Sequence, residues 1–147
     1  MTNEDTVRAL CKNILSRLEN SQAICFVKEG WKVAPGEVFN LVGPKVLTEE
    51  DLKNKTLEQL GFAKEQIEEV SVTEGEQFKA AKRMVRRSFG EDELNGLYYQ
   101  MPMKTIADQI CQYLMSSQQI DDVFESDDTL SKMIVDVMRK FNPRNLH

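Results

Sequence analysis

Five cations on one short stretch of the chain are the residues whose type and spacing point most directly to a binding chemistry. They are Lys79, Lys82, Arg83, Arg86 and Arg87. At about 100° per residue they fall within an arc of about 140° of a helix. The opposite side would be apolar and carries Phe78, Ala81, Met84, Val85 and Phe89. Because lysine and arginine bind phosphate oxygens and release counterions, this face predicts contact with an anionic polymer, nucleic acid included.

A second interpretation of the same face is internal neutralisation. Acids flank the predicted helix on both sides, at Glu74, Glu76, Glu91, Asp92 and Glu93. Runs of charge on a helix are most often a solvated surface whose mutual repulsion is relieved by neighbouring acids. The sequence leaves both interpretations of the basic helix open.

Residues for catalysis are sparse. The only histidine, His147, is the last residue, where a frayed end does not hold a ring against a nucleophile, so the sequence argues against Ser-His-Asp and Cys-His hydrolases. The glycines stand singly and form no phosphate-binding fingerprint. We therefore predict a protein that is not an enzyme and has no cofactor.

A cluster of acids near the C-terminus is the one arrangement that suggests a metal. It consists of Asp121, Asp122, Glu125, Asp127 and Asp128. The cluster lacks the alternate spacing and central glycine of a calcium loop. Acids just before a helix cap its free N–H groups, which explains Ser126, Asp127 and Asp128 without a metal. We predict no metal site; a carboxylate-based, metal-dependent enzyme using Asp121 or Asp127 is the alternative.

Composition places the chain among globular proteins. Its 147 residues are 41% hydrophobic and 29% charged with a net charge of -5, and no apolar run approaches the roughly 18 residues of a membrane span. The acidic N-terminus does not resemble a secretory signal. Three cysteines, Cys11, Cys25 and Cys111, sit among apolar neighbours as free thiols would. These features predict a cytoplasmic protein without membrane contact.

Helical periodicity dominates the chain. Apolar residues at steps of three and four predict helices over 7–18 and 130–141, the second opened by Ser126 and ended by Pro143. Capping-box spacings at Thr2/Asp5 and Thr48/Asp51 open two helices, the latter ending at Gly61. Further helices are predicted over 37–42, 63–70, 73–89, 91–99 and 103–115.

These elements predict a mainly α, compact helical domain over residues 1–147, with an optional small β-hairpin near residues 23–34, where Gly30 can turn the chain. The two ends also resemble each other, Leu10-Cys11 lining up with Ile110-Cys111. That match leaves two related helical lobes, 1–60 and 101–141, as a form that internal duplication would produce.

A set of spaced motifs in residues 106–141 carries a family resemblance. It comprises a helix ending in Ser116-Ser117, the step Asp121-Asp122-Val123-Phe124, the acidic turn Asp127-Asp128 and a helix ending in Arg139-Lys140. This segment resembles the C-terminal block of a bacterial family catalogued as domain of unknown function 507. Weaker matches at 47–60 and 79–90 extend the resemblance to the middle of the chain. It implies a helical bacterial cytoplasmic protein and brings no catalytic residues.

Together the residues favour a non-catalytic binding or adaptor protein whose partner is a protein or an anionic polymer, with the face carrying Lys79, Lys82, Arg83, Arg86 and Arg87 as the contact. A salt-dependent nucleic-acid-binding protein is the first alternative. The carboxylate-based enzyme is the second. The sequence leaves the oligomeric state open.

Overall fold

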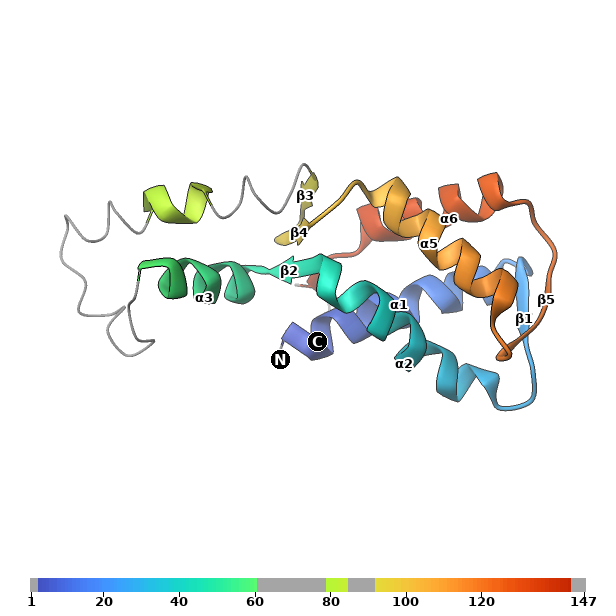
Figure 1. Cartoon of the computed structure of the whole chain (residues 1–147). Helices are drawn as coiled ribbons and strands as arrows, with labels where there is room; N and C mark the ends of the chain where they lie inside the picture. Colours follow the sequence, from blue (N-terminus) through green and yellow to red (C-terminus); the bar gives the residue numbers. More distant parts are fainter. Residues whose placement is uncertain (1–2, 61–78, 85–91, 144–147) are drawn as a thin grey trace.

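Four helices form the body of the protein. The computed structural model describes residues 3–60, 79–84 and 92–143. Within it, α1 (Asn3–Asn20) packs on α2 (Gly30–Val42) and on α6 (Asp127–Lys140), and α5 (Met103–Ser116) packs on α6 and α2. The four helices therefore make a closed ring, called the bundle below (Figure 1). None of the described helices has the length and apolarity needed to cross a membrane.

The bundle forms because each helix buries one apolar stripe. In α1 the stripe is the predicted one, with Val7, Leu10, Cys11, Ile14, Leu15 and Leu18 all buried. In α6 it comprises Leu130, Ile134, Val137 and Met138, followed by Phe141. Ser126 caps α6 by accepting a hydrogen bond from the Thr129 N–H at 3.3 Å. The mainly α fold class and both terminal helices are confirmed.

Two short strands close one end of the bundle, and they correct the position of the predicted hairpin. β1 (Ile24–Phe26) lies inside the predicted 23–34 segment, but it pairs antiparallel with β5 (Ile120–Val123) from the other end of the chain. The second half of the segment belongs to α2, which also contains the short helix predicted over 37–42. Gly30, Ala34, Val38 and Val42 recur every four residues and are buried, so helical periodicity prevails over Pro35 and Gly36.

A three-stranded antiparallel sheet lies at the opposite end. It has the order β2-β4-β3, formed by β2 (Val46–Thr48), which follows the short 3-10 helix η1 (Gly43–Lys45), β4 (Leu97–Tyr99) and β3 (Asp92–Leu94). The prediction of a helix over 91–99 is wrong. Asn95 and Gly96 have φ angles of 56° and 83°, which makes the two-residue turn that joins antiparallel strands.

Beyond this sheet an arm extends away from the bundle (Figure 1). We define the arm as α3 (Glu49–Leu60) and the helical residues 79–84. The predicted capping box opens α3: the Thr48 N–H donates to Asp51 Oδ2 at 3.2 Å, and the Asp51 N–H donates to Thr48 Oγ1 at 3.3 Å. Gly61, Gly90, the predicted helix over 63–70 and the rest of the one over 73–89 lie outside the described residues, as does Thr2.

Where the arm meets the three-stranded sheet, the described residues form a small apolar cluster that is separate from the bundle core. Leu47, Leu52 and Tyr98 form a small cluster, called the arm cluster below, that is distinct from the bundle core. Both ends of the chain follow the order helix, strand, helix, as α1-β1-α2 and α5-β5-α6. This order agrees with the predicted duplication of 1–60 and 101–141, which stays a prediction.

Candidate functional site

The basic helix presents only part of its predicted face. Lys79 and Arg83 are exposed, Lys82 is partly buried, and Arg86 and Arg87 lie outside the described residues. On the predicted apolar side Ala81 is buried, as expected, whereas Met84 is 60% exposed. Lys82 reaches Glu49 of α3, whereas Met84, two residues further on, projects from the other side of the turn. Part of the predicted apolar side of the 79–84 helix is therefore exposed.

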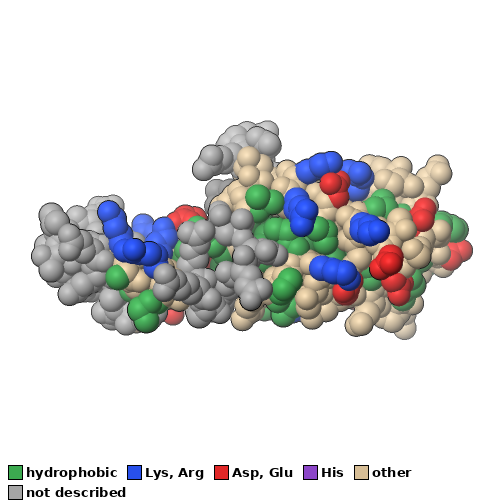
Figure 2. Space-filling model, turned by 90° about the horizontal axis from the view of Figure 1, so that it is seen from above, with side chains coloured by type: hydrophobic (Ala, Val, Ile, Leu, Met, Phe, Trp, Pro, Cys, Tyr) green, Lys and Arg blue, Asp and Glu red, His purple; other side chains and the backbone are tan. Residues whose placement is uncertain are grey.

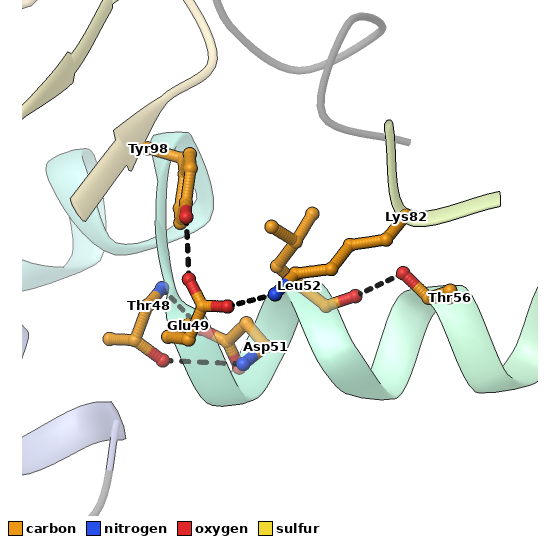
Figure 3. A network of polar contacts seen from close by, with 7 residues as sticks. All are labelled: Thr48, Glu49, Asp51, Leu52, Thr56, Lys82 and Tyr98. Atoms are coloured by element: carbon orange, nitrogen blue, oxygen red, sulfur yellow. Dashed lines mark hydrogen bonds and ion pairs between the residues drawn. The ribbon is translucent and has the colours of Figure 1, made fainter. Parts of the chain in front are cut away.

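Lys82 is held inside the arm by a carboxylate from α3. The Lys82 Nζ group pairs with Glu49 Oε1, and the Tyr98 hydroxyl donates to Glu49 Oε2 (Figure 3). Flanking acids were the predicted source of neutralisation, but among the described residues the partner is Glu49, from a distant part of the chain. One of the five predicted cations thus positions the turn. Lys79 and Arg83 are left at its surface.

Beside this network lies a shallow hollow of about 260 Å³ lined by Lys79, Lys82, Arg83 and Tyr98. The Arg83 Nε–H donates to the Lys79 carbonyl at 3.4 Å, a long and weak hydrogen bond. Because that bond is weak, the Arg83 guanidinium can turn toward an anionic group without a large loss. The hollow is large enough for one such group.

A second group of cations lies on the bundle, in a groove of about 400 Å³ between α5 and α6. Lys104, Lys132 and Arg139 line it, together with Asp128, Ser131 and Asp136. Lys104 pairs with Asp108 at 3.1 Å, whereas Lys132 and Arg139 make no ion pair within the described part of the chain. Figure 2 shows lysine and arginine side chains over both the 79–84 helix and the bundle in one view. We call Lys79, Arg83, Lys104, Lys132 and Arg139 the basic face.

Part of the second group can be recognised from the sequence. Lys132 and Arg139 are seven residues apart on α6, so they share one side of that helix. Lys104 joins them only through the packing of α5 on α6. Only the tertiary structure therefore shows that Lys104 belongs to this group of cations.

The acids near the C-terminus act as the capping interpretation predicts. Asp127 and Asp128 stand in the first turn of α6 behind the Ser126 cap, and Asp122 accepts a hydrogen bond from the Val123 N–H at 2.8 Å. Among the residues that the structure describes, no group of three or more His, Cys, Asp or Glu side chains is placed to hold a metal ion. Helix capping accounts for Ser126, Asp127 and Asp128.

All three cysteines are free thiols, as predicted, and each is protonated at neutral pH. Burial raises the pKa of Cys11 to about 12 and that of Cys111 to about 11. Desolvation, with the negative charge of Asp121, also raises the pKa of Cys25. Since the thiolate is the nucleophile, none of these side chains is activated for covalent chemistry.

Burial predicts which thiol reacts with an external reagent. Cys25 is the partly exposed one, whereas Cys11 and Cys111 are buried in the bundle. We expect the folded protein to consume about one equivalent of a disulfide reagent and the unfolded protein about three, with a rate at Cys25 that rises with pH because its thiolate is scarce near neutrality. A fast phase that persists in Cys25→Ser would contradict the assignment.

Taken together, the geometry defines a mainly α protein: a four-helix bundle with a small sheet at each end and a projecting helical arm. The family model described as "Protein of unknown function (DUF507)" matches residues 2–145 of the 147. The chain therefore belongs to this family, which confirms the resemblance seen in residues 106–141. No curated protein and no solved structure matches it.

Proposed function

We propose that this chain is a non-catalytic binding protein that docks an anionic partner on the basic face. The observation that carries the proposal is the placement of two groups of cations, one on the arm and one on the bundle, on the same side of the molecule (Figure 2). The chain as a whole has a net charge of -5, so these cations are gathered on one side of a protein that is acidic overall. An anionic partner would be attracted to this side.

The ion pairs around these groups support a role in binding. Lys82 is fixed by Glu49, which orients the turn that carries Lys79 and Arg83. Exposed pairs such as Lys104–Asp108 are worth little in water and exchange readily for a new anion. The site therefore combines a positioned backbone with cations that are free to change partners.

Nucleic acid is the second candidate, favoured by the separation of the two groups. A compact anion would contact either the arm or the α5–α6 groove, whereas a chain of phosphates can follow the face from one to the other (Figures 1 and 2). Phosphate contacts of this kind give affinity without sequence preference.

A non-catalytic role is supported by the chemistry of the nucleophiles that are present. The raised pKa values of Cys11 and Cys111 keep both thiols protonated. The only histidine of the chain is its last residue. The carboxylate enzyme alternative would require activity that depends on Asp121 or Asp127 and on an added metal ion.

Charge reversal tests the basic face. We expect Lys79→Glu/Arg83→Glu and Lys132→Glu/Arg139→Glu each to weaken binding of a fluorescent single-stranded oligonucleotide at least tenfold at low salt, measured by fluorescence anisotropy. Each lost phosphate contact removes about 0.7 from the slope of log affinity against log salt, so each pair should remove about 1.4. Lys28→Glu, an exposed cation beside β1, is the control for reversing a single charge outside the basic face and should bind nearly as the wild type does.

The outcomes separate the two candidates. Tight binding of polyglutamate with no binding of the oligonucleotide would overturn the nucleic-acid candidate and would keep the basic face as a site for an acidic protein. If both double variants bind the two polymers as tightly as the wild type does, the basic face is not the binding site. Thermal unfolding of every variant checks that the fold survives.

A further inference from the structure

The side of the bundle opposite the basic face carries a second, chemically different groove. In the ring of helices α1 and α2 are neighbours, and they lie across the bundle from the groove between α5 and α6 (Figure 1). The space between α1 and α2, called the α1–α2 groove below, has a volume of about 750 Å³. Clefts of this size hold several side chains of a ligand.

The floor of the groove is apolar and open. Leu15 of α1 and Pro35 of α2 line it, and Pro35 has no backbone N–H to solvate. Gly36 follows, and a Cβ atom built on it would meet nothing within 4 Å. A ligand can therefore approach the backbone of α2 at this point without displacing a side chain of the protein.

An exposed indole lines the groove. Trp31, the only tryptophan of the chain, is 58% exposed, and Phe26 belongs to the same lining. Tryptophan is among the residues most enriched at the energetic centres of protein interfaces, because its large surface gains most from burial. The Lys32 Nζ group lies 5.4 Å from the centre of the Trp31 ring, and more than half of the side chain is still open to a partner.

The rim of the groove is mostly basic. Arg8, Lys12 and Lys32 line it. Arg8 pairs with Glu4 at 2.7 Å and Lys32 with Glu29 at 3.5 Å, both in solvent, and Lys12 has no ion pair among the described residues. Among the described residues that line the groove, Glu19 is the one acid. The rim therefore complements carboxylates, in a protein that is acidic overall.

We propose that the α1–α2 groove binds an acidic amphipathic helix of a partner protein. Its apolar residues would rest on Leu15, Pro35 and Gly36 with one against Trp31, and its carboxylates would meet the basic rim, as in other complexes of a helix in a groove. The apolar floor favours aliphatic side chains over nucleic-acid bases, which would stack on aromatic rings, and the described part of the lining offers two such rings, Trp31 and Phe26. This groove is separate from the basic face, so the two proposals stand independently.

Trp31 makes the groove directly observable, since no other tryptophan contributes to the fluorescence. The probe is a synthetic helical peptide with leucines at i, i+4 and i+7 and glutamates on its other side, and its control is the same composition scrambled so that the leucines share no face. We expect the first peptide to shift the Trp31 emission to the blue in a saturable way and the scrambled one to leave it unchanged. Anisotropy of the dye-labelled peptide gives the affinity independently.

Variants of the full chain locate the binding. Trp31→Ala, Lys12→Glu and Gly36→Leu should each weaken peptide binding at least tenfold, the last because the leucine side chain would start from an open position and occupy part of the groove. Lys132→Glu, in the groove on the other side, should leave it unchanged. Equal binding of the scrambled peptide, absence of a saturable shift, or affinity insensitive to all three groove variants overturns the proposal. So does quenching of Trp31 by oligothymidylate, because it would make the groove a nucleic-acid site.

Discussion

Gly30→Ala is expected to lower the free energy of unfolding by about 3 kcal/mol, since it forces a side chain into a packed backbone contact. A Cβ atom at Gly30 would lie 2.4 Å from the Gln119 carbonyl oxygen and 3.1 Å from Val27 Cγ2. The Val27 N–H donates to the same Gln119 oxygen at 2.9 Å, and the Gly30 N–H donates to the Val27 carbonyl at 2.8 Å. Relief of the clash would therefore break the link between the start of α2 and the segment before β5.

The same helix offers a matched control in Gly36→Ala, where the added Cβ atom meets nothing within 4 Å. Alanine costs less backbone entropy than glycine in a helix, so this variant should be more stable than the wild type by about 0.5–1 kcal/mol. Urea unfolding followed by circular dichroism measures both. Equal stability of Gly30→Ala and the wild type would show that α2 and the Gln119 backbone do not approach so closely.

The elements predicted correctly are those specified by residues close together in the chain. The stripes of α1 and α6 recur at helical spacing, and the Thr48/Asp51 capping box closes within one turn of α3. Helix formation at these positions depends on neighbours three or four residues away. Their spacing is therefore visible in the sequence alone.

The errors concern contacts between distant segments. β1 has a recognisable strand composition, but nothing near it in the chain indicates that Cys25 lies opposite Asp122 of β5. The prediction of a helix over 91–99 overlooked the Asn95-Gly96 pair, a strong local signal for a two-residue hairpin turn. The sequence near β1 contains no information about its pairing partner. The signal for the hairpin turn was present in the sequence, but the apparent helical pattern of residues 91–99 outweighed it.

In the candidate site, too, local features were predictable from the sequence and contacts between distant segments were not. Helical spacing was enough to place Lys79 and Arg83 together, and both are exposed as predicted. The pairing of Lys82 with Glu49, and the meeting of Lys104 with Lys132 and Arg139, depend on how helices pack. Charge patterning thus identified one part of the basic face, and tertiary structure supplied the other.

Leu52→Ala is expected to unfold the arm while the bundle stays folded. Leu52 is fully buried and belongs to the arm cluster with Leu47 and Tyr98, which is separate from the bundle core. Truncating a buried leucine costs about 3 kcal/mol, a large loss for so small a cluster. Local opening then costs less than global unfolding, so hydrogen exchange at the amides of α3 should accelerate while exchange in α1 and α6 stays at the wild-type rate.

Leu114→Ala, in the bundle core, is the control for Leu52→Ala. Leu114 is as buried as Leu52, but its loss should lower the stability of α1, α5 and α6 together because they share one core. Since Lys79 and Arg83 lie on the arm, Leu52→Ala should also weaken anion binding about as much as reversing those two charges does. If Leu52→Ala instead accelerates exchange equally in α3 and α1, the arm and the bundle unfold as one unit, and the basic face is held in place by the stability of the whole protein.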